Sequence, residues 1–362
     1  MIERKVAQLP DLSNPPAAPV ADPPGSDDPW QQAWCRLYDT PNALVPLGTI
    51  MHWRSVAGGL GVVTSLDHDT ALVSRGYFYR PHTPPPDAVD LEADRRAAAA
   101  AEAEWLLYPV IRTGDTGALG ASGHPGLPWF VEAEFVPTGD IDRDLRTVLG
   151  GTRFRDLRRL VRRSDEHFVW EVTRGEQIDD GTLVEFDRLH QLNLAKYGHR
   201  HNHFALPILR GLAASGLRER LCVFGHRTRT GIPVQAALAV HYPESATLEI
   251  LVHGIDHAAV PSSQNLYAAT MYRIYRWGQA HGIGRFNLGR GAERVKLDLG
   301  ANRFHVVANY LVPASGATTP DPVVDRLAAA ARTATTRSVH TLNTVVARRG
   351  LGGVVTTPRS PG

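Results

Sequence analysis

The stretch GRFNLGRGAERVKLDLGA, residues 284–301, decides the fold of this chain. Within it, RFNLGR predicts a short strand, and Lys296 lies just past that strand. Directly before it, residues 262–283 have the pattern of an amphipathic helix, for which Ser262 or Ser263 is the expected N-cap. The chain is therefore expected to run from a helix into a strand and then to a lysine.

Upstream of this stretch, the sequence predicts three strands in an antiparallel meander, over residues 218–227, 232–243 and 246–256. Two helices are expected before the meander, over residues 181–198 and 204–217. They follow a strand at 167–175 and one or two helices at 140–166, with Gly150 and Gly151 as the break. The order is thus helix, three strands, helix, strand.

The N-terminal part has weaker signals. Short apolar runs between residues 44 and 79 suggest strands of a mixed sheet, residues 91–110 a helix with a strand-like exit, and residues 129–137 another strand. We expect a disordered, Pro-rich leader (1–29), an N-terminal domain (30–150), a C-terminal domain (151–313), and a final helix and tail (314–362).

Composition excludes several classes of protein. A chain of 362 residues, with 43% hydrophobic and 21% charged residues, is neither wholly disordered nor a coiled-coil rod. Its apolar runs are shorter than the roughly 18–20 residues that span a bilayer, and its start has no apolar signal segment. Two cysteines, Cys35 and Cys222, cannot form a disulfide framework or a Cys-based zinc site. The expected location is cytoplasmic.

Arginine dominates the positive charge. The net charge is +2, and only three of the 39 basic residues are lysines. RFRDLRRLVRR, residues 153–163, has six arginines and one aspartate. Arg155, Arg158, Arg159 and Arg162 recur at helical spacing, so they share much of one face. This face is either solvated surface or a contact for phosphate, in a nucleic-acid backbone or in coenzyme A.

Three segments carry a resemblance to known families: residues 153–163, 186–198 and 287–301. Their order resembles the C-terminal half of GNAT-fold transferases built from two tandem GNAT-like domains. The likeness is greatest to the CelD-like acyltransferases and to the Fem family of aminoacyl-tRNA-dependent transferases. It covers residues 152–313 best. The implied fold is α/β (α+β), with two tandem GNAT-like domains, the first degenerate, each a mixed, mostly antiparallel sheet flanked by helices.

The segment HGIDHAAVPSSQNLY, residues 253–267, bears on the acyl donor. GNAT enzymes hold the pyrophosphate of acetyl-CoA on a Gly-rich loop at a helix N-terminus, where backbone N–H groups contact the anion. This segment has one glycine and a proline that lacks an N–H group. It resembles the Fem pattern, in which the acyl group arrives esterified to tRNA. We therefore expect aminoacyl-tRNA as donor, with acyl-CoA as the alternative, and no tightly bound cofactor.

Candidate catalytic residues follow from the resemblance and from strand alternation. In the Fem-like pattern, the lysine that matches Lys296 contributes positive charge at the reacting carbonyl. On the strand 246–256, Glu249, Leu251 and His253 are expected to share one face. Glu249 or His253 could then accept the proton of an attacking amine. A purely structural role, with a local polar partner, is the alternative for both.

Five further residues are candidates for substrate binding: Arg290, Glu293, Asp256, Tyr197 and Lys196. Arg290 and Glu293 flank Lys296 and could orient it or form a local salt bridge. Asp256, at a strand end, is a weaker candidate base. Tyr197 and Lys196 end a predicted helix, where they could edge a pocket.

The remaining patterns in the sequence predict no metal, nucleotide-binding or nucleophile site. The alternating His199, His201 and His203 have no carboxylate or fourth ligand at a useful spacing, so no metal site is expected. GGLG, residues 58–61, lacks the context of a dinucleotide fingerprint and is interpreted as a turn. No nucleophile elbow, Walker loop or kinase signature is present. The sequence thus predicts an acyltransferase that joins an aminoacyl group to a small amine, such as a cell-wall precursor or specialised metabolite. The alternatives are an acyl-CoA-dependent N-acyltransferase and a non-catalytic RNA-binding module.

Overall fold

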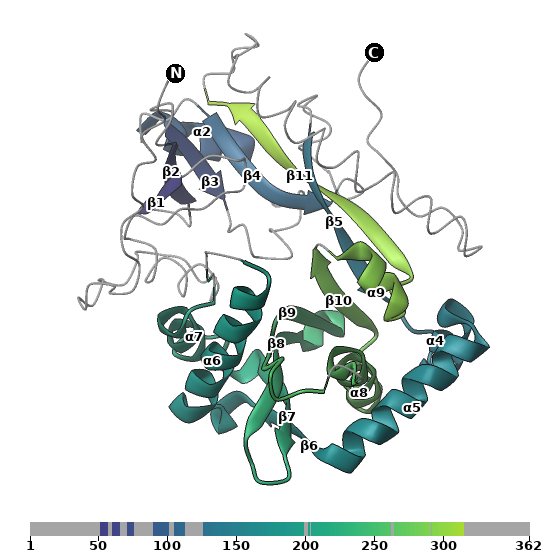
Figure 1. Cartoon of the computed structure of the whole chain (residues 1–362). Helices are drawn as coiled ribbons and strands as arrows, with labels where there is room; N and C mark the ends of the chain where they lie inside the picture. The colour runs from purple at the N-terminus through teal and green to yellow at the C-terminus, as the bar shows by residue number, and fades with distance from the viewer. Residues whose placement is uncertain are drawn as a thin grey trace, which may run out of the picture.

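The computed structural model describes these parts of the chain: residues 51–56, 60–65, 71–75, 90–100, 105–112, 126–198, 202, 204–261, 264–290 and 292–314. The strands in these parts form one sheet of 11 strands, in the order β1-β2-β3-β4-β11-β5-β10-β9-β8-β7-β6 (Figure 1). Its strand pairs are antiparallel except β3 with β4 and β9 with β10. The expected α/β fold with a mixed, mostly antiparallel sheet is confirmed.

The N-terminal elements of the sheet include a unit of three strands, a helix and a fourth strand, here called the first unit. Its members are β1 (Met51–Val56), β2 (Leu60–Ser65), β3 (Ala71–Arg75), α2 (Leu91–Ala100) and β4 (Trp105–Arg112). The strands β1, β2 and β3 are antiparallel neighbours, and β4 returns parallel to β3. β5 (Gly126–Phe135) follows.

Two consecutive helices cover one face of the sheet. α4 (Ile141–Leu149) and α5 (Gly151–His167) meet at Gly150, whose φ of 83° is a conformation that glycine adopts readily, so the predicted break is confirmed. α5 buries Phe154, Leu157 and Val161. The next elements are β6 (Phe168–Arg174), α6 (Asp180–Lys196) and α7 (Leu206–Ala213).

The predicted meander is present and begins what we call the second unit. Its elements are β7 (Leu221–Thr228), β8 (Pro233–Tyr242), β9 (Thr247–Ile255), α8 (Leu266–Ala280) and β10 (Arg285–Arg290). α9 (Glu293–Asp298) and β11 (Arg303–Pro313) complete the described chain. Single 3-10 turns occur at Gly175–Gln177, Arg218–Arg220 and Pro243–Ser245. The two units have the same order and the same pairing directions.

Each unit pairs its fourth strand with a strand from the other half of the chain. β11, which follows the second unit, pairs with β4, whereas β5, which follows the first unit, pairs with β10. β5 and β11 also pair with each other, so the sheet is continuous. The domain boundary near residue 150 remains a prediction.

The two faces of the sheet differ. Under α4, α5 and α8 lies the main apolar core, in which the ring of Phe135 lies 4.6 Å from Tyr275 and 6.0 Å from Phe286, measured between centroids. This core also buries a polar group: His226 Nδ1 lies 3.0 Å from Gln235 Oε1 and 3.1 Å from Thr270 Oγ1. Burial outweighs the hydrogen bond that the ring makes to Gln235 Oε1 and lowers the pKa of His226 to about 4.

α6 packs against the opposite face, directly on the backbone of β9. A Cβ atom at Gly254 would lie 2.5 Å from the backbone nitrogen of His190, so only glycine fits there. None of the helices in the described ranges has both the length and the hydropathy to cross a bilayer. The leader at 1–29, the expected helix at 321–350, Gly58, and the histidines at 199, 201 and 203 lie outside the described residues.

Candidate functional site

The parallel strands β9 and β10 pair over only three residues and then separate. Thr247–Glu249 pair with Arg285–Asn287, and beyond Asn287 the strand β10 pairs only with β5. A register shift between Asn287 and Arg290 marks a bulge that contains Gly289, whose φ is 70°. A glycine in the left-handed region is typical of a bulge that bends its strand. The bend leaves a gap between the two strands, here called the β9–β10 gap.

Lys296 extends into the β9–β10 gap from α9. Its side chain is buried, with 5% of the residue exposed. Its Nζ atom lies 3.9 Å from the position that a Cβ atom would occupy on Gly289, and the carbonyl oxygen of Ile250 on β9 lies 3.6 Å from the same position. α9 begins after Ala292, which has a φ of 51°, a strained value for a residue with a side chain. Backbone strain of this kind clusters at functional sites.

His253 stands beside the same gap, on the side of α8. Its ring lies 4.5 Å from the ring of Tyr267, and the charge of Lys296 acts on it. Although part of the side chain is exposed, both ring nitrogens are buried and have no hydrogen-bond partner among the described residues. Burial, then Lys296 and His190, lower the pKa of His253 to about 3. The imidazole is therefore neutral at pH 7.

Glu249 lies on the other face of the sheet, which corrects the expected shared face. Along β8, Leu238 is opposite Val252 but the next residue, Ala239, is opposite Ile250. One extra residue of β9 is thus inserted at Leu251, and it reverses the alternation between Glu249 and His253. Strand alternation predicted from sequence does not include such a bulge.

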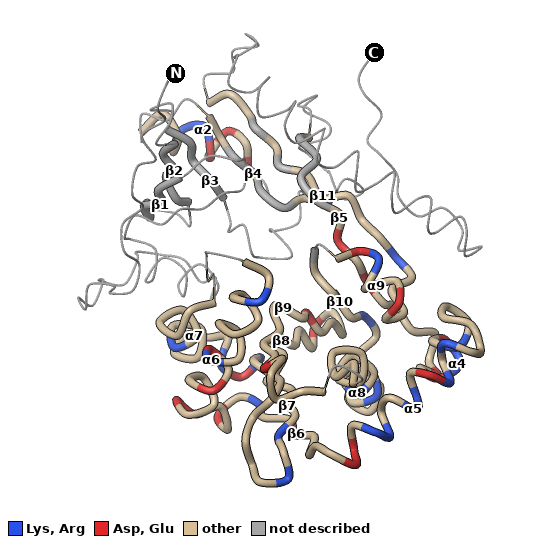
Figure 2. Tube along the Cα trace, in the orientation of Figure 1, with Lys and Arg blue, Asp and Glu red and all other residues tan. Residues whose placement is uncertain are grey.

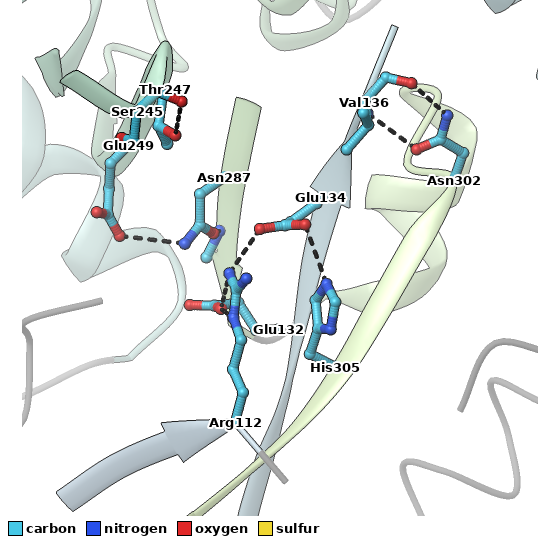
Figure 3. A network of polar contacts seen from close by, with 11 residues as sticks. Arg112, Glu132, Glu134, Val136, Ser245, Thr247, Glu249, Asn287, Asn302 and His305 are labelled. Carbon is cyan, nitrogen blue, oxygen red and sulfur yellow. Dashed lines mark hydrogen bonds and ion pairs between the residues drawn. The ribbon is translucent and has the colours of Figure 1, made fainter. Parts of the chain in front are cut away.

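Glu249 belongs to a row of buried polar side chains that crosses the sheet (Figure 3). Its Oε1 accepts a hydrogen bond from Asn287 Nδ2 at 3.3 Å, and Asn287 Oδ1 accepts one from the backbone N–H of Gly289 at 2.8 Å. Asn287 thereby stabilises the bend of β10. Asn287 is also directly opposite Glu134 of β5, so the row continues on the same face.

The rest of the row is an ion cluster between β4, β5 and β11. Arg112 donates from Nε and Nη2 to Glu132 Oε2, at 2.9 and 2.7 Å, and from Nη2 to Glu134 Oε1 at 2.6 Å. His305 Nε2 lies 3.0 Å from Glu134 Oε2. Burial raises the pKa of Glu134, but His305 and Arg112 outweigh burial and lower it to about 2. Burial opposes the charge of Arg112, while Glu132 and Glu134 raise its pKa.

Sequence analysis did not identify Arg112, Glu132, Glu134, Asn287 or His305. One signal was present: Glu132 and Glu134 are two residues apart in a predicted strand, so they face the same side. Three carboxylates and one arginine that are nine-tenths or more buried require partners from neighbouring strands. Those partners lie between 20 and more than 150 residues away along the chain.

Lys196, Tyr197 and Asp256 come together where α6 ends beside the loop after β9. Lys196 Nζ donates to His257 Nδ1 at 3.1 Å, and the ring of Tyr197 lies 6.3 Å from that of His257. Asp256 pairs with Arg188 at 3.3 Å. These residues form one partly exposed polar cluster, on the α6 side of β9. Glu293 is the first residue of α9, and of Arg290 the structure describes only the backbone.

The predicted arginine face of α5 is exposed, and part of it is paired with acids (Figure 2). Arg158 bonds Asp142 of α4, and Arg159 pairs with Asp156 at 3.1 Å. Within the described ranges, Arg162 has no ion-pair partner, and Arg155 bonds only Thr152. Arg155 and Arg162 therefore present the freest guanidinium groups of the predicted set.

One ion pair links α5 to α9, and the N-cap of α8 differs from the predicted one. Arg153 Nη1 lies 3.0 Å from Asp298 Oδ1, which ties the start of α5 to the end of α9. The N-cap of α8 is Asn265, rather than Ser262 or Ser263, and its side chain accepts from the backbone N–H of Ala268. The protein's own side chain thus occupies a donor of the helix N-terminus that would bind an anion.

Comparisons with known proteins show the fold. No family model and no curated protein matches the sequence. Among solved structures, L-PGS from Bacillus licheniformis is 13% identical, with a TM-score of 0.53 over 84% of this chain and 96% of that one. The C-terminal domain of a protein assigned as a lysylphosphatidylglycerol synthetase, from Agrobacterium fabrum, is 15% identical, with a TM-score of 0.52 over 82% and 92%. FemX is 11% identical, with a TM-score of 0.51 over 73% and 84%. The chain has a GNAT-like fold.

Proposed function

We propose that this protein is an acyltransferase that moves an aminoacyl group from aminoacyl-tRNA to a small amine and forms an amide bond. The observation that carries the proposal is the buried ammonium of Lys296 in the β9–β10 gap, whose charge acts on the neutral imidazole of His253. An amine that attacks an ester carbonyl produces an oxyanion, which a fixed positive charge in a water-poor site stabilises. FemX shares this fold and carries the name of the Fem family that the sequence resembles.

In this reaction Lys296 stabilises the oxyanion, and His253 receives the proton of the amine. Within the described part of the chain, the ring nitrogens of His253 have no hydrogen-bond partner, and the negative charge that develops nearby raises the affinity of the ring for a proton as the reaction proceeds. The C–N bond forms, the C–O bond to the ribose breaks, and the ribose oxygen leaves with a proton. Glu249 fits a supporting role better, because its carboxylate bonds Asn287 on the other face of the sheet.

Two observations favour tRNA over coenzyme A as the source of the acyl group. The first turn of α8 is capped by Asn265, so the usual pyrophosphate contact is partly occupied. The exposed arginines of α5 begin beside α9, which carries Lys296, and would contact a phosphate backbone next to the gap. The names of the similar synthetases describe a lysyl group joined to phosphatidylglycerol, which fits aminoacyl transfer in general.

The test is RNA retention followed by transfer. The protein is purified at low salt, absorbance is compared at 260 and 280 nm, and bound RNA is sequenced. Enrichment of one tRNA family, and transfer of its labelled amino acid to an amine-containing metabolite pool, are the expected results. Absence of RNA together with a thermal shift on adding acyl-CoA would favour the acyl-CoA-dependent N-acyltransferase. Bound tRNA without any transfer would favour the RNA-binding module.

A further inference from the structure

A chain of hydrogen bonds leads from the exposed end of α6 to the main chain of β9. Lys196 Nζ donates to His257 Nδ1 at 3.1 Å. The other ring nitrogen, Nε2, donates to Asn193 Oδ1 at 3.1 Å, and Asn193 Nδ2 donates to the carbonyl oxygen of His253 at 3.3 Å. Because Nδ1 of His257 accepts a hydrogen bond, its proton is on Nε2. Every donor in the chain therefore points toward β9.

The carbonyl of His253 also accepts a second hydrogen bond from α6. His190 Nδ1 lies 3.2 Å from it. The strand β10 no longer pairs with β9 at this residue, so side chains of α6 bond the carbonyl in place of a neighbouring strand. α6 contacts the backbone of Gly254 without a side chain between them. The C-terminal end of β9 is thus held by α6.

The held carbonyl and the imidazole belong to the same residue. While α6 bonds the carbonyl, the ring stands against Tyr267 of α8, where the charge of Lys296 acts on it. Any movement of the carbonyl therefore moves the ring relative to the ammonium. Displacement of a reacting group by about 1 Å can reduce a rate by about 100-fold.

We propose that Asn193 is a positioning residue for the transfer reaction, because its amide holds the His253 carbonyl and so sets where the imidazole stands relative to Lys296. This inference rests on the role proposed above for His253. Asn193 bonds the main chain of His253 and not its ring. Its amide is suited to the task because it accepts from His257 and donates to His253 at the same time.

Three variants test this proposal. N193D keeps the size of the side chain and the acceptor for His257, but it loses the donor to His253. N193A removes both bonds. N302A is the matched control, because Asn302 also makes two bonds, accepting from the backbone N–H of Val136 and donating to its carbonyl, both at 2.9 Å. Circular dichroism and thermal melts establish that each variant is folded.

Nuclear magnetic resonance of protein labelled with 15N-histidine follows the His253 ring without any substrate, with H253Q to assign its signals. We expect these signals to move in N193D and N193A and to stay in N302A. In the transfer assay, kcat should fall about 10–100-fold in both Asn193 variants, with KM for the acceptor unchanged. N302A should lose stability and keep its kcat.

Unmoved His253 signals in N193D, or equal movement in N302A, would overturn the proposal. The transfer assay of H253Q separates it from the proposed function. Retained turnover in H253Q would remove His253 from the mechanism and this inference with it. Lost turnover in H253Q, combined with normal turnover in N193D, would remove the role of Asn193 alone.

Discussion

The first and second units have the same order of elements but differ at the pair of parallel strands. In the first unit, the three pairs between β3 and β4 join Leu72 to Trp105, Val73 to Leu106 and Ser74 to Leu107. In the second unit, the corresponding pairs include Glu249 with Asn287, followed by a bulge and a buried lysine. One topology thus supports a mostly apolar junction in one half and a polar gap in the other. The two strand pairs therefore differ in the polarity of their residues although their topology is the same.

The buried ion cluster of Arg112, Glu132 and Glu134 joins the first unit to β5, the strand that pairs with β10 of the second unit, and its loss is the largest expected effect. R112M leaves two buried carboxylates without their guanidinium partner and should lower the free energy of unfolding by about 3–5 kcal/mol. Urea denaturation measures this loss. R112M/E132Q/E134Q, which removes the uncompensated charges, should recover part of it. An unchanged midpoint in R112M would show that the cluster does not stabilise the sheet.

The second prediction contrasts the two units directly. K296A should reduce turnover by about 100- to 1000-fold without unfolding the protein, because it removes the charge that stabilises the oxyanion. Y108F is the counterpart in the first unit: it breaks a buried hydrogen bond of 2.8 Å to Asp94 and should lower stability by about 1–3 kcal/mol. Its turnover should stay at the wild-type level. Steady-state kinetics and thermal melts on both variants check this, and normal turnover in K296A would remove Lys296 from the mechanism.

The third prediction concerns acid sensitivity of the core of the second unit. His226 has a pKa of about 4 in the folded state, below its usual value near 6.5, so the unfolded chain binds the proton more readily. Stability is therefore complete above about pH 6.5 and declines as the pH falls toward 4, by about 3 kcal/mol. H226F should show a shallower decline in urea titrations over this range. Parallel curves for the two proteins would contradict it.

The smallest expected effect is on tRNA binding by the exposed arginines of α5. R155A and R162A each remove an exposed guanidinium group that makes no ion pair among the described residues. If tRNA binds there, each variant should weaken binding modestly and lower the slope of log K against log salt by about 1. Fluorescence anisotropy with labelled tRNA at several salt concentrations measures the slope. R159A should change the slope less, because Arg159 pairs with Asp156. Unchanged slopes in all three variants would show that the arginines of α5 are solvated surface and do not contact tRNA.

Local patterns predicted much of the fold. The helices α5, α6 and α8 and the meander β7–β9 were expected because each has its own periodicity and its own end signals, such as Gly150 and Gly198. No strand was expected at β11, whose partners β4 and β5 lie nearly 200 residues earlier in the chain. Its place depends on pairing between distant segments, which periodicity does not report.

The candidate site was predicted in part. The sequence predicts Lys296 and His253 as site residues, and the structure places both at the β9–β10 gap. Glu249 was assigned to the wrong face, because an extra residue at Leu251 reverses the alternation. Asn193 and Arg112 gave no signal at all. Their contacts connect different elements, and a hydrogen bond between elements leaves no trace in the spacing of residues along one of them.

The exchange of strands between the halves has a consequence for how the protein is made. The edge of β4 that pairs with β11 stays uncovered until the ribosome has produced about 190 more residues, from Arg112 to Arg303. At roughly 5–20 residues per second, that wait is about 10–40 s. An uncovered strand edge is a template for pairing with other chains. The nascent protein is therefore expected to depend on chaperones at the ribosome during that interval, and to depend on them less once β11 has been translated.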